Sequence, residues 1–155
     1  MTTAGGRLVR SRRLQSDRFL DTSNQKLSAD KCALRLRREP DRITITYKGA
    51  PQAGPVKSRE EIETTVADAD RLELLFSRLG FTEHWRFEKH REDYELKGVS
   101  VFVDESSAGV YVEIEATPDL IEQTAARLGK GPADYVLSSY RSLATSGKAS
   151  ADTAE

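Results

Sequence analysis

The sequence predicts an α+β fold built around one large antiparallel β-sheet. Most of the chain divides into short segments in which apolar and polar residues alternate, the pattern of half-buried strands. These segments mostly follow one another through short turns, as in a meander, and helical spacing replaces the alternation in only a few places. Since 155 residues is the size of one ordinary domain, we expect about seven strands and three helices around a single core.

The expected strands are separated by turn residues such as glycine, proline, aspartate and asparagine. They cover residues 10–19, 32–38, 42–49, 56–66, 85–96, 99–104 and 109–116. The first helix is indicated by Leu72, Leu75, Phe76 and Leu79, with Asp68 or Asp70 as its cap and Gly80 as its end. A second helix is expected over 118–128, ended by Gly129, and a third over 135–144. The tail from Thr145 is small and polar, and we expect it to be disordered.

Successive strand residues point to opposite faces of a sheet, so each strand has two faces to compare. In the segment 32–38, Leu34 and Leu36 share one face, while Arg35 and Arg37 share the other. Each later strand likewise combines an apolar face with a polar one. The charges on the polar faces are, in chain order, Arg35, Arg37, Lys48, Arg59, Glu61, Glu63, Lys89, Arg91, Asp104, Glu113 and Glu115.

These charges are grouped by sign on each strand. For a single strand, a polar face that meets water is the ordinary explanation. It explains the whole set less well, because like charges two residues apart on one face repel each other and a surface sheet gains nothing from them. A closed barrel with a polar interior, holding a polyanion and a divalent metal, would use both groups. Guanidinium groups pair with phosphate oxygens, and carboxylates hold Mg²⁺ or Mn²⁺.

Composition argues against several other classes of protein. Lysine plus arginine (24) nearly balance aspartate plus glutamate (25), whereas a dedicated nucleic-acid binder is usually basic. Aromatic residues, at 7%, are too few for a surface that stacks bases, so we expect no nucleic-acid partner. The single cysteine, Cys32, excludes an intramolecular disulfide. No apolar run is long enough to span a membrane and no signal core is evident, so we expect no membrane partner and a cytoplasmic location.

A set of short motifs occurs in order along the chain, each of them weak alone. They are QSDRFLD at 15–21, ALRLR at 33–37, YKG at 47–49, KSREEIE at 57–63, EKHR at 88–91, VDE at 103–105, YVEIE at 111–115 and SY at 139–140. Together they resemble the CYTH superfamily of triphosphate tunnel metalloenzymes, which includes class IV adenylyl cyclases, thiamine triphosphatases and inorganic triphosphatases. The resemblance covers roughly residues 6–143, and the sequences at 15–17 and 57–63 are most similar to the cyclase branch.

This resemblance implies an eight-stranded antiparallel tunnel with helices packed outside it. By that likeness the residues that bind triphosphate would be Arg35, Arg37, Lys48, Arg59, Lys89 and Arg91. Those that hold Mg²⁺ or Mn²⁺, or tune the basic groups, would be Glu61, Glu63, Asp104, Glu113 and Glu115. No catalytic residue is assigned.

One departure from the family pattern affects both the fold and the activity. The family opens with a strand bearing a Glu-x-Glu-x-Lys signature, then a helix, and nothing before Leu8 supplies either. We therefore expect about seven of the eight family strands, in a tunnel domain over residues 6–144 that is incomplete at its N-terminus. The last strand would lack its family neighbour, and an open strand edge favours pairing with a second copy, so a homodimer is expected.

The resulting hypothesis is a metal-dependent enzyme that acts on a nucleoside triphosphate or on inorganic triphosphate. It would be a class IV adenylyl cyclase, converting ATP to cyclic AMP and pyrophosphate, or an inorganic or organic triphosphatase. Because the signature strand is missing, the alternative is a module that binds triphosphate or polyphosphate without turnover.

Overall fold

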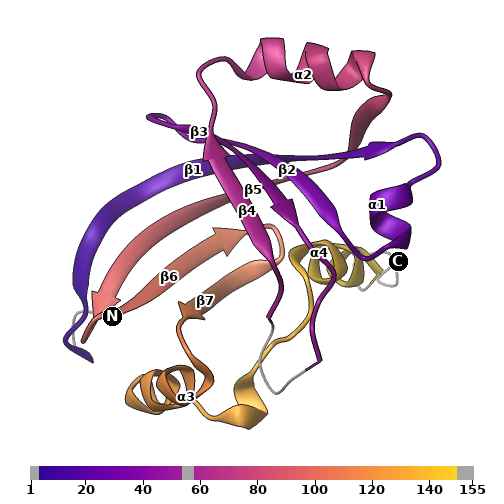
Figure 1. Cartoon of the computed structure of the whole chain (residues 1–155). Helices are drawn as coiled ribbons and strands as arrows, with labels where there is room; N and C mark the ends of the chain where they lie inside the picture. The colour runs from indigo at the N-terminus through magenta and orange to yellow at the C-terminus, as the bar shows by residue number, and fades with distance from the viewer. Residues whose placement is uncertain (1–3, 54–57, 150–155) are drawn as a thin grey trace, which may run out of the picture. The chain divides into compact units, whose positions relative to one another are not determined.

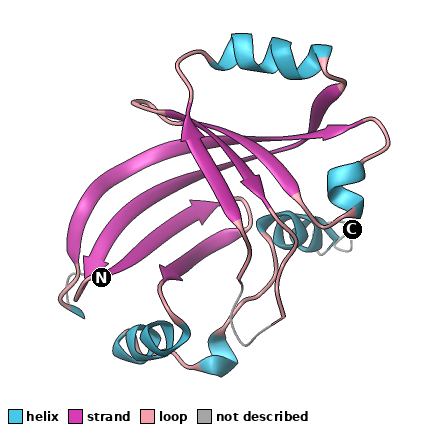
Figure 2. Ribbon diagram, viewed as in Figure 1, coloured by secondary structure: helices cyan, strands magenta, loops and turns pink. Residues whose placement is uncertain are grey.

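The computed structural model describes residues 4–53 and 58–149. Within them, seven strands form one antiparallel sheet in the order β4-β3-β2-β1-β5-β6-β7, which confirms the predicted fold class (Figures 1 and 2). The strands are β1 (Arg7–Thr22), β2 (Ala33–Arg38), β3 (Ile43–Lys48), β4 (Glu61–Thr65), β5 (Phe81–Leu96), β6 (Val99–Ser106) and β7 (Gly109–Glu115). The helices are α1 (Lys26–Ala29), α2 (Ala69–Arg78), α3 (Pro118–Arg127) and α4 (Tyr140–Ala149), with a 3-10 turn at Pro132–Asp134.

The chain forms two compact units, and the long strands β1 and β5 contribute to both. One unit is Leu14–Glu88. The other combines Met1–Arg13 with Lys89–Glu155. Each unit has its own polar sheet face, so the two are considered separately below.

In the unit Leu14–Glu88, the polar face of β3 is more buried than its apolar face. Thr46 is 0% exposed and Thr44 2%, whereas their apolar neighbours on β3, Ile43 and Ile45, are only partly buried. The register places Arg37 opposite Asp17 on β1 and opposite Thr44 on β3. A polar face that merely met water would show the reverse. Arg37 and Asp17 are therefore part of the interior.

Helix α2 begins and ends where the sequence indicates. The Asp68 side chain caps its N-terminus by accepting a hydrogen bond from the Arg71 backbone N–H. After the helix, Gly80 has a φ of 87°, a left-handed conformation that glycine adopts without strain. Of the apolar positions, however, Leu75 (53%) and Leu79 (64%) are exposed.

In the other unit, the sheet face opposite the charges carries the hydrophobic core. Leu96, Val99 and Val101 are almost fully buried. The partly buried residues that pack against them are Tyr94, Ile114, Ala116 and Leu128. Because side chains alternate along β6, Val101 lies in this core and Asp104 lies on the opposite, polar face.

Several boundaries differ from the sequence expectation. Strand β4 begins only at Glu61, so Arg59 lies in the preceding loop and not on the strand with Glu61 and Glu63; positions 56 and 57 lie outside the described residues. The expected helix over 135–144 is instead α4, which starts at Tyr140 and continues past Thr145 through Ala149. The rest of the expected tail, 150–155, is outside the described residues. None of the helices in the described part of the chain is long and apolar enough to cross a membrane.

Candidate functional site

The first charged cluster lies on the polar face of β1 to β4, in the unit Leu14–Glu88. We call it the β2–β4 cluster, and it consists of Asp17, Arg35, Arg37, Thr46, Lys48, Glu61 and Glu63. Its most buried pair is Arg37 with Asp17, which face each other across β2 and β1. The guanidinium Nε and NH2 atoms each lie 2.7 Å from an Asp17 carboxylate oxygen. This paired geometry fixes the Arg37 side chain on the polar face.

Arg35 lies two residues before Arg37 on the same strand face, and its contacts are looser. Its NH2 donates to the Thr46 hydroxyl at 3.1 Å and to Glu63 at 3.4 Å. Its Nε atom is buried and has no hydrogen-bond partner among the described residues. Burial, followed by the charge of Arg37, lowers the pKa of the Arg35 guanidinium. Arg35 therefore has a donor in place for an anionic partner.

Lys48 ends β3 on the same face, opposite Glu61 of β4. Its ammonium nitrogen lies 2.6 Å from a Glu61 carboxylate oxygen. Burial and the nearby charge of Arg35 lower the pKa of Lys48 to about 8, although Glu61 opposes the change. Arg59, half-buried in the loop before β4, also contributes to lowering the pKa of Lys48. The lowered pKa of Lys48 therefore reflects its burial first and the nearby positive charges second.

The second cluster lies on the polar face of the other unit. We call it the β5–β7 cluster, and it consists of Lys89, Arg91, Asp104, Glu113 and Tyr140. Asp104 is 0% exposed and is the common acceptor. Lys89 Nζ lies 2.5 Å from Asp104, and Arg91 Nε and NH2 each lie 2.6 Å from it. Arg91 also pairs with Glu113.

These contacts set the charge states within the β5–β7 cluster. Burial alone would raise the pKa of Asp104, but its hydrogen bonds and ion pairs with Arg91 and Lys89 hold that pKa below the usual value. The pKa of Lys89 is lowered by burial, against the attraction of Glu113 and Asp104. Asp104 therefore remains ionised and pairs with two cations, Lys89 and Arg91.

Tyr140 is the member of this cluster to which the sequence assigned no role, although the SY motif includes it. Its hydroxyl donates to Asp104 at 2.7 Å, and its ring lies 4.6 Å from the Lys89 ammonium. Burial and the negative charge of Glu113 and Asp104 raise the pKa of Tyr140. Tyr140 is the first residue of α4, so this contact fastens the helix to the cluster.

The carboxylates assigned to a metal are mostly engaged by cations. Glu61 pairs with Lys48, Glu63 with Arg35, and Glu113 with Arg91. Glu115 lies on β7 opposite Ser100 and is exposed. No group of three or more histidine, cysteine, aspartate or glutamate side chains that could hold a metal occurs among the described residues. As arranged here, the carboxylates do not form a ready-made metal site.

The structure therefore gathers most of the predicted residues into two sets. Arg35, Arg37 and Lys48 share the β2–β4 cluster with Glu61 and Glu63. Lys89 and Arg91 share the β5–β7 cluster with Asp104 and Glu113. Arg59 and Glu115 lie at the margins of these sets: Arg59 is in the loop before β4, and Glu115 is exposed at the end of β7.

Comparisons with known proteins support one family. The model of the CYTH domain matches residues 6–140. A protein of Methanocaldococcus jannaschii named "Putative adenylate cyclase" is 30% identical over 105 residues, which cover 67% of this chain and 60% of that protein. The chain thus aligns with less than two thirds of that relative's length.

Solved structures share the fold over most of the chain. A protein of Vibrio parahaemolyticus, described as a "putative adenylate cyclase", has a TM-score of 0.79 at 17% identity, covering 90% of this chain and 84% of its own. A Pyrococcus horikoshii protein has a TM-score of 0.65 at 30% identity, covering 79% and 75%. A Hippeastrum protein, described as a "putative adenylyl cyclase" with a dominant triphosphatase activity, has a TM-score of 0.70 at 20% identity, covering 88% and 83%. Because the family model spans residues 6–140, which is most of the sequence, this chain belongs to the CYTH domain family.

Proposed function

We propose that this chain binds a triphosphate through its buried basic residues and processes it. Arg35, Arg37, Lys48, Lys89 and Arg91 are the proposed phosphate ligands, with Arg59 as a further ligand from the loop before β4. The names of the relatives support two reactions, adenylyl cyclase and triphosphatase. In the cyclase reaction the ribose 3′-hydroxyl of ATP attacks the α-phosphorus and pyrophosphate leaves. In the triphosphatase reaction water attacks the terminal phosphorus, the bond to the bridging oxygen breaks, and the diphosphate leaves while the attacked phosphorus becomes orthophosphate.

The observation that carries this proposal is the state of Arg35. Its side chain is only 11% exposed, yet its Nε atom has no hydrogen-bond partner among the described residues. A buried charged donor without a partner is costly, and phosphate oxygens are the acceptors that a guanidinium pairs with best. Arg37 lies beside it on the same face, and like charges held together in this way favour an anion carrying several charges.

We propose that Mg²⁺ or Mn²⁺ arrives bound to the triphosphate, as the metal–substrate complex. Phosphate oxygens would compete with Glu61 and Glu63 for the cations Lys48 and Arg35. The released carboxylates, with Glu113 and Glu115, are then the oxygen donors available to the metal, which prefers such ligands. The metal, when bound, would neutralise phosphate charge, while the basic side chains would orient the phosphates.

A binding module without turnover is the second candidate. It is favoured by one observation, namely that the described carboxylates are engaged by cations and gather into no metal-binding group. This candidate shares the phosphate ligands with the enzyme and differs only in forming no product.

Calorimetric titration with magnesium tripolyphosphate tests the shared step. Arg35→Ala should weaken binding about tenfold or more, because a hydrogen bond to a charged group contributes about 1.5–3 kcal/mol. Arg86→Ala is the matched control, since Arg86 is exposed, lies on β5 of the same unit and pairs with Glu83. It should bind as the unaltered chain does. Equal binding by the Arg35→Ala variant and the unaltered chain would refute the proposed role of Arg35.

A further inference from the structure

Two of the proposed phosphate ligands in the β2–β4 cluster already hold carboxylates, which belong to Glu61 and Glu63 of β4. Lys48 lies directly opposite Glu61, and its ammonium nitrogen is 2.6 Å from a Glu61 carboxylate oxygen. Thr46 lies opposite Glu63 and donates to it at 2.6 Å, and Arg35 NH2 is 3.4 Å from the same oxygen. The two carboxylates therefore occupy positions that phosphate oxygens would take.

The carboxylates also balance the charge of the cluster. Burial would raise the pKa of Glu61, but the hydrogen bond from Lys48 and the charges of Lys48 and Arg35 hold that pKa below its usual value, so Glu61 stays ionised at neutral pH. Each of the three cations in the cluster pairs with one carboxylate: Arg35 with Glu63, Arg37 with Asp17, and Lys48 with Glu61. As arranged, the cluster has no excess positive charge with which to attract an anion.

Exposure shows which of these carboxylates can leave. The side chains of Glu61 and Glu63 are each 44% exposed, whereas that of Asp17 is 4% exposed. Strand β4 stands at one end of the strand order, and all five of its residues are exposed. Glu61 and Glu63 can therefore turn towards water at a small cost, because ion pairs at such exposed positions contribute little.

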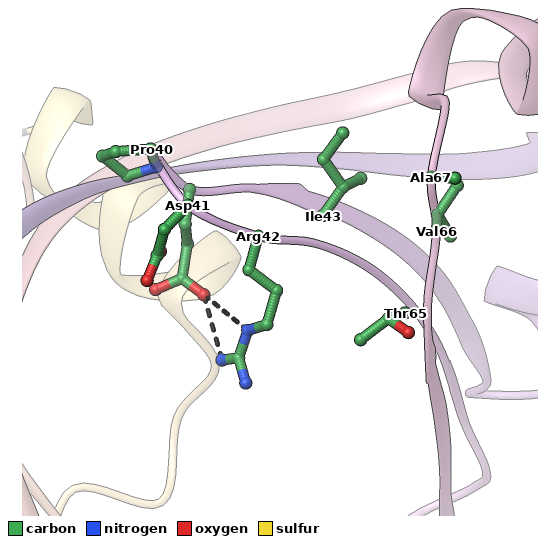
Figure 3. A pocket seen from close by; sticks show the side chains of 8 residues that line it. Pro40, Asp41, Arg42, Ile43, Thr65, Val66 and Ala67 are labelled. Atoms are coloured by element: carbon green, nitrogen blue, oxygen red, sulfur yellow. Dashed lines mark hydrogen bonds and ion pairs between the residues drawn. The ribbon is translucent and has the colours of Figure 1, made fainter.

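A cavity in the same unit shows the opposite case, a carboxylate that is fixed. The cavity has a volume of about 400 Å³ and is lined by residues of the β2–β3 turn and of the end of β4 (Figure 3). There Arg42 donates to Glu39 through Nε at 3.2 Å and NH2 at 3.0 Å. Glu39 also accepts from Gln15 at 3.1 Å, and its side chain is 0% exposed. A dissolved anion cannot replace a carboxylate held in this way at a small cost.

We propose that Glu61 and Glu63 are exchangeable counter-anions that set the minimum charge of the ligand accepted by the β2–β4 cluster. The inference rests on the proposed function, since it concerns the triphosphate bound by Arg35 and Lys48. A small anion of low charge replaces a carboxylate with a group of similar charge and gains little. A triphosphate brings more negative charge than both carboxylates together and reaches several cations at once, so it alone gains from the exchange.

Removing the two carboxylate charges should strengthen triphosphate binding, whereas removing a group that holds the ligand would weaken it. The double variant Glu61→Gln/Glu63→Gln keeps an oxygen that accepts from Lys48 and Thr46, and both positions are exposed, so the fold should persist, which circular dichroism checks. Calorimetry in buffer freed of divalent cations should show that it binds tripolyphosphate about fivefold or more tightly than the unaltered chain. Divalent cations are left out because they would give the carboxylates a second role.

Glu60→Gln is the matched control. Glu60 is exposed and directly precedes Glu61, but it lies in the loop outside β4, and the carboxylates that pair with Lys48 and Arg35 are those of Glu61 and Glu63. The control removes the same charge from almost the same place without releasing either cation. It should bind tripolyphosphate within about twofold of the unaltered chain, since solvent and salt screen an exposed charge.

Orthophosphate tests the charge requirement itself. The unaltered chain should bind it much more weakly than tripolyphosphate, and the double variant should bind it about fivefold or more tightly than the unaltered chain does. An orthophosphate affinity that is the same in both proteins would show that Glu61 and Glu63 do not exclude anions of low charge.

Tripolyphosphate binding by the double variant that is equal to or weaker than that of the unaltered chain would overturn the inference. The proposed function would still stand in that case, provided that the unaltered chain binds magnesium tripolyphosphate. If neither protein binds tripolyphosphate, with or without Mg²⁺, the inference and the proposed function fail together.

Discussion

The Lys48 ammonium lies near the Glu61 carboxylate and the Arg35 guanidinium, so its pKa depends on both neighbours. Burial and Arg35 lower its pKa to about 8 from 10.5. The folded chain thus binds fewer protons at Lys48 than the unfolded chain between about pH 8 and pH 10.5. The contribution of Lys48 to the free energy of unfolding accordingly rises as the pH increases through that window.

A bound triphosphate would reverse the shift at Lys48. Negative charge favours the protonated ammonium, so binding of ATP near pH 8.5 should be accompanied by proton uptake. Calorimetric titration in two buffers of different ionisation enthalpy measures that uptake. Lys48→Met should lower it markedly. A titration that takes up no protons in the unaltered chain would show that ATP does not approach Lys48.

Tyr140 offers a second test at a single side chain. Tyr140→Phe keeps the ring beside Lys89 but removes the hydroxyl that donates to the buried Asp104. We expect a loss of about 1–3 kcal/mol in the free energy of unfolding, measured by urea denaturation. Tyr94→Phe, which removes a hydroxyl that donates to the less buried Glu92, should cost less. Equal losses would mean that the Tyr140–Asp104 hydrogen bond stabilises the fold no more than the Tyr94–Glu92 hydrogen bond does.

At the residue scale, the sequence correctly predicted which face of the sheet a side chain lies on, because alternation alone decides that. Arg35 and Arg37 share a polar face with Thr44 and Thr46, as a period of two requires. Tyr140 was not predicted as part of the cluster because it follows β7 by a helix and a loop, and no periodic pattern links it to Asp104. The partial burial of Cys32, whose thiol lies 3.3 Å from the Tyr47 hydroxyl, was likewise set by a neighbour on another strand.

At the scale of the element, the short helix α1 after β1 is held by hydrogen bonds to the side chain of Asp21. The Asp21 carboxylate accepts hydrogen bonds from the backbone N–H groups of Leu27 and Ser28 and from the Ser28 hydroxyl. Helix α1 is too short to be signalled by apolar periodicity, and it is stabilised by Asp21 together with Thr22, whose hydroxyl accepts a hydrogen bond from the Lys26 backbone N–H. Burial would raise the pKa of Asp21, but these hydrogen bonds lower it to about 2 from 3.8.

Asp21→Ala should therefore destabilise the fold by about 1–3 kcal/mol at pH 7. The pKa of Asp21 is depressed, so its contribution is complete above about pH 4 and is lost as the pH falls towards 2. Urea denaturation from pH 7 to pH 3 should show the difference between the two proteins narrowing below pH 4. A difference independent of pH would indicate that the ionised carboxylate is not responsible.

Element boundaries were predictable where a cap marks them. Asp68 and Gly80 delimit α2 as expected. The start of β4 was not predictable, because alternation continues back through Arg59 while the ladder with β3 begins at Glu61. Helical spacing correctly identified α2, but Leu75 and Leu79 are exposed, so fewer of its apolar residues are buried than the spacing predicts.

At the scale of the molecule, the antiparallel sheet followed from successive alternating segments, whereas its strand order, in which β1 lies beside β5, was not predicted. Family membership came from the ordered motifs, which the CYTH model matches over residues 6–140. What sequence could not provide is which carboxylate pairs with which cation. Those partners depend on register, as the pairing of Lys48 with Glu61 and of Arg35 with Glu63 illustrates.

Strand β7 stands at one end of the strand order, and its Val110 (68%) and Val112 (49%) are exposed. An open edge with exposed apolar side chains favours pairing with a second chain, so we predict a homodimer. Sedimentation velocity over a range of concentrations should show reversible dimers, and Val110→Lys should weaken them. A monomer at every concentration would contradict this prediction.

Phosphorus NMR of the chain mixed with ATP, and separately with tripolyphosphate, in the presence of Mg²⁺ or Mn²⁺ tests the central claim most directly. The proposed function predicts product from at least one of them. Cyclic AMP with pyrophosphate would identify a cyclase, and orthophosphate a triphosphatase. A folded sample that forms no product with either substrate would contradict the enzyme.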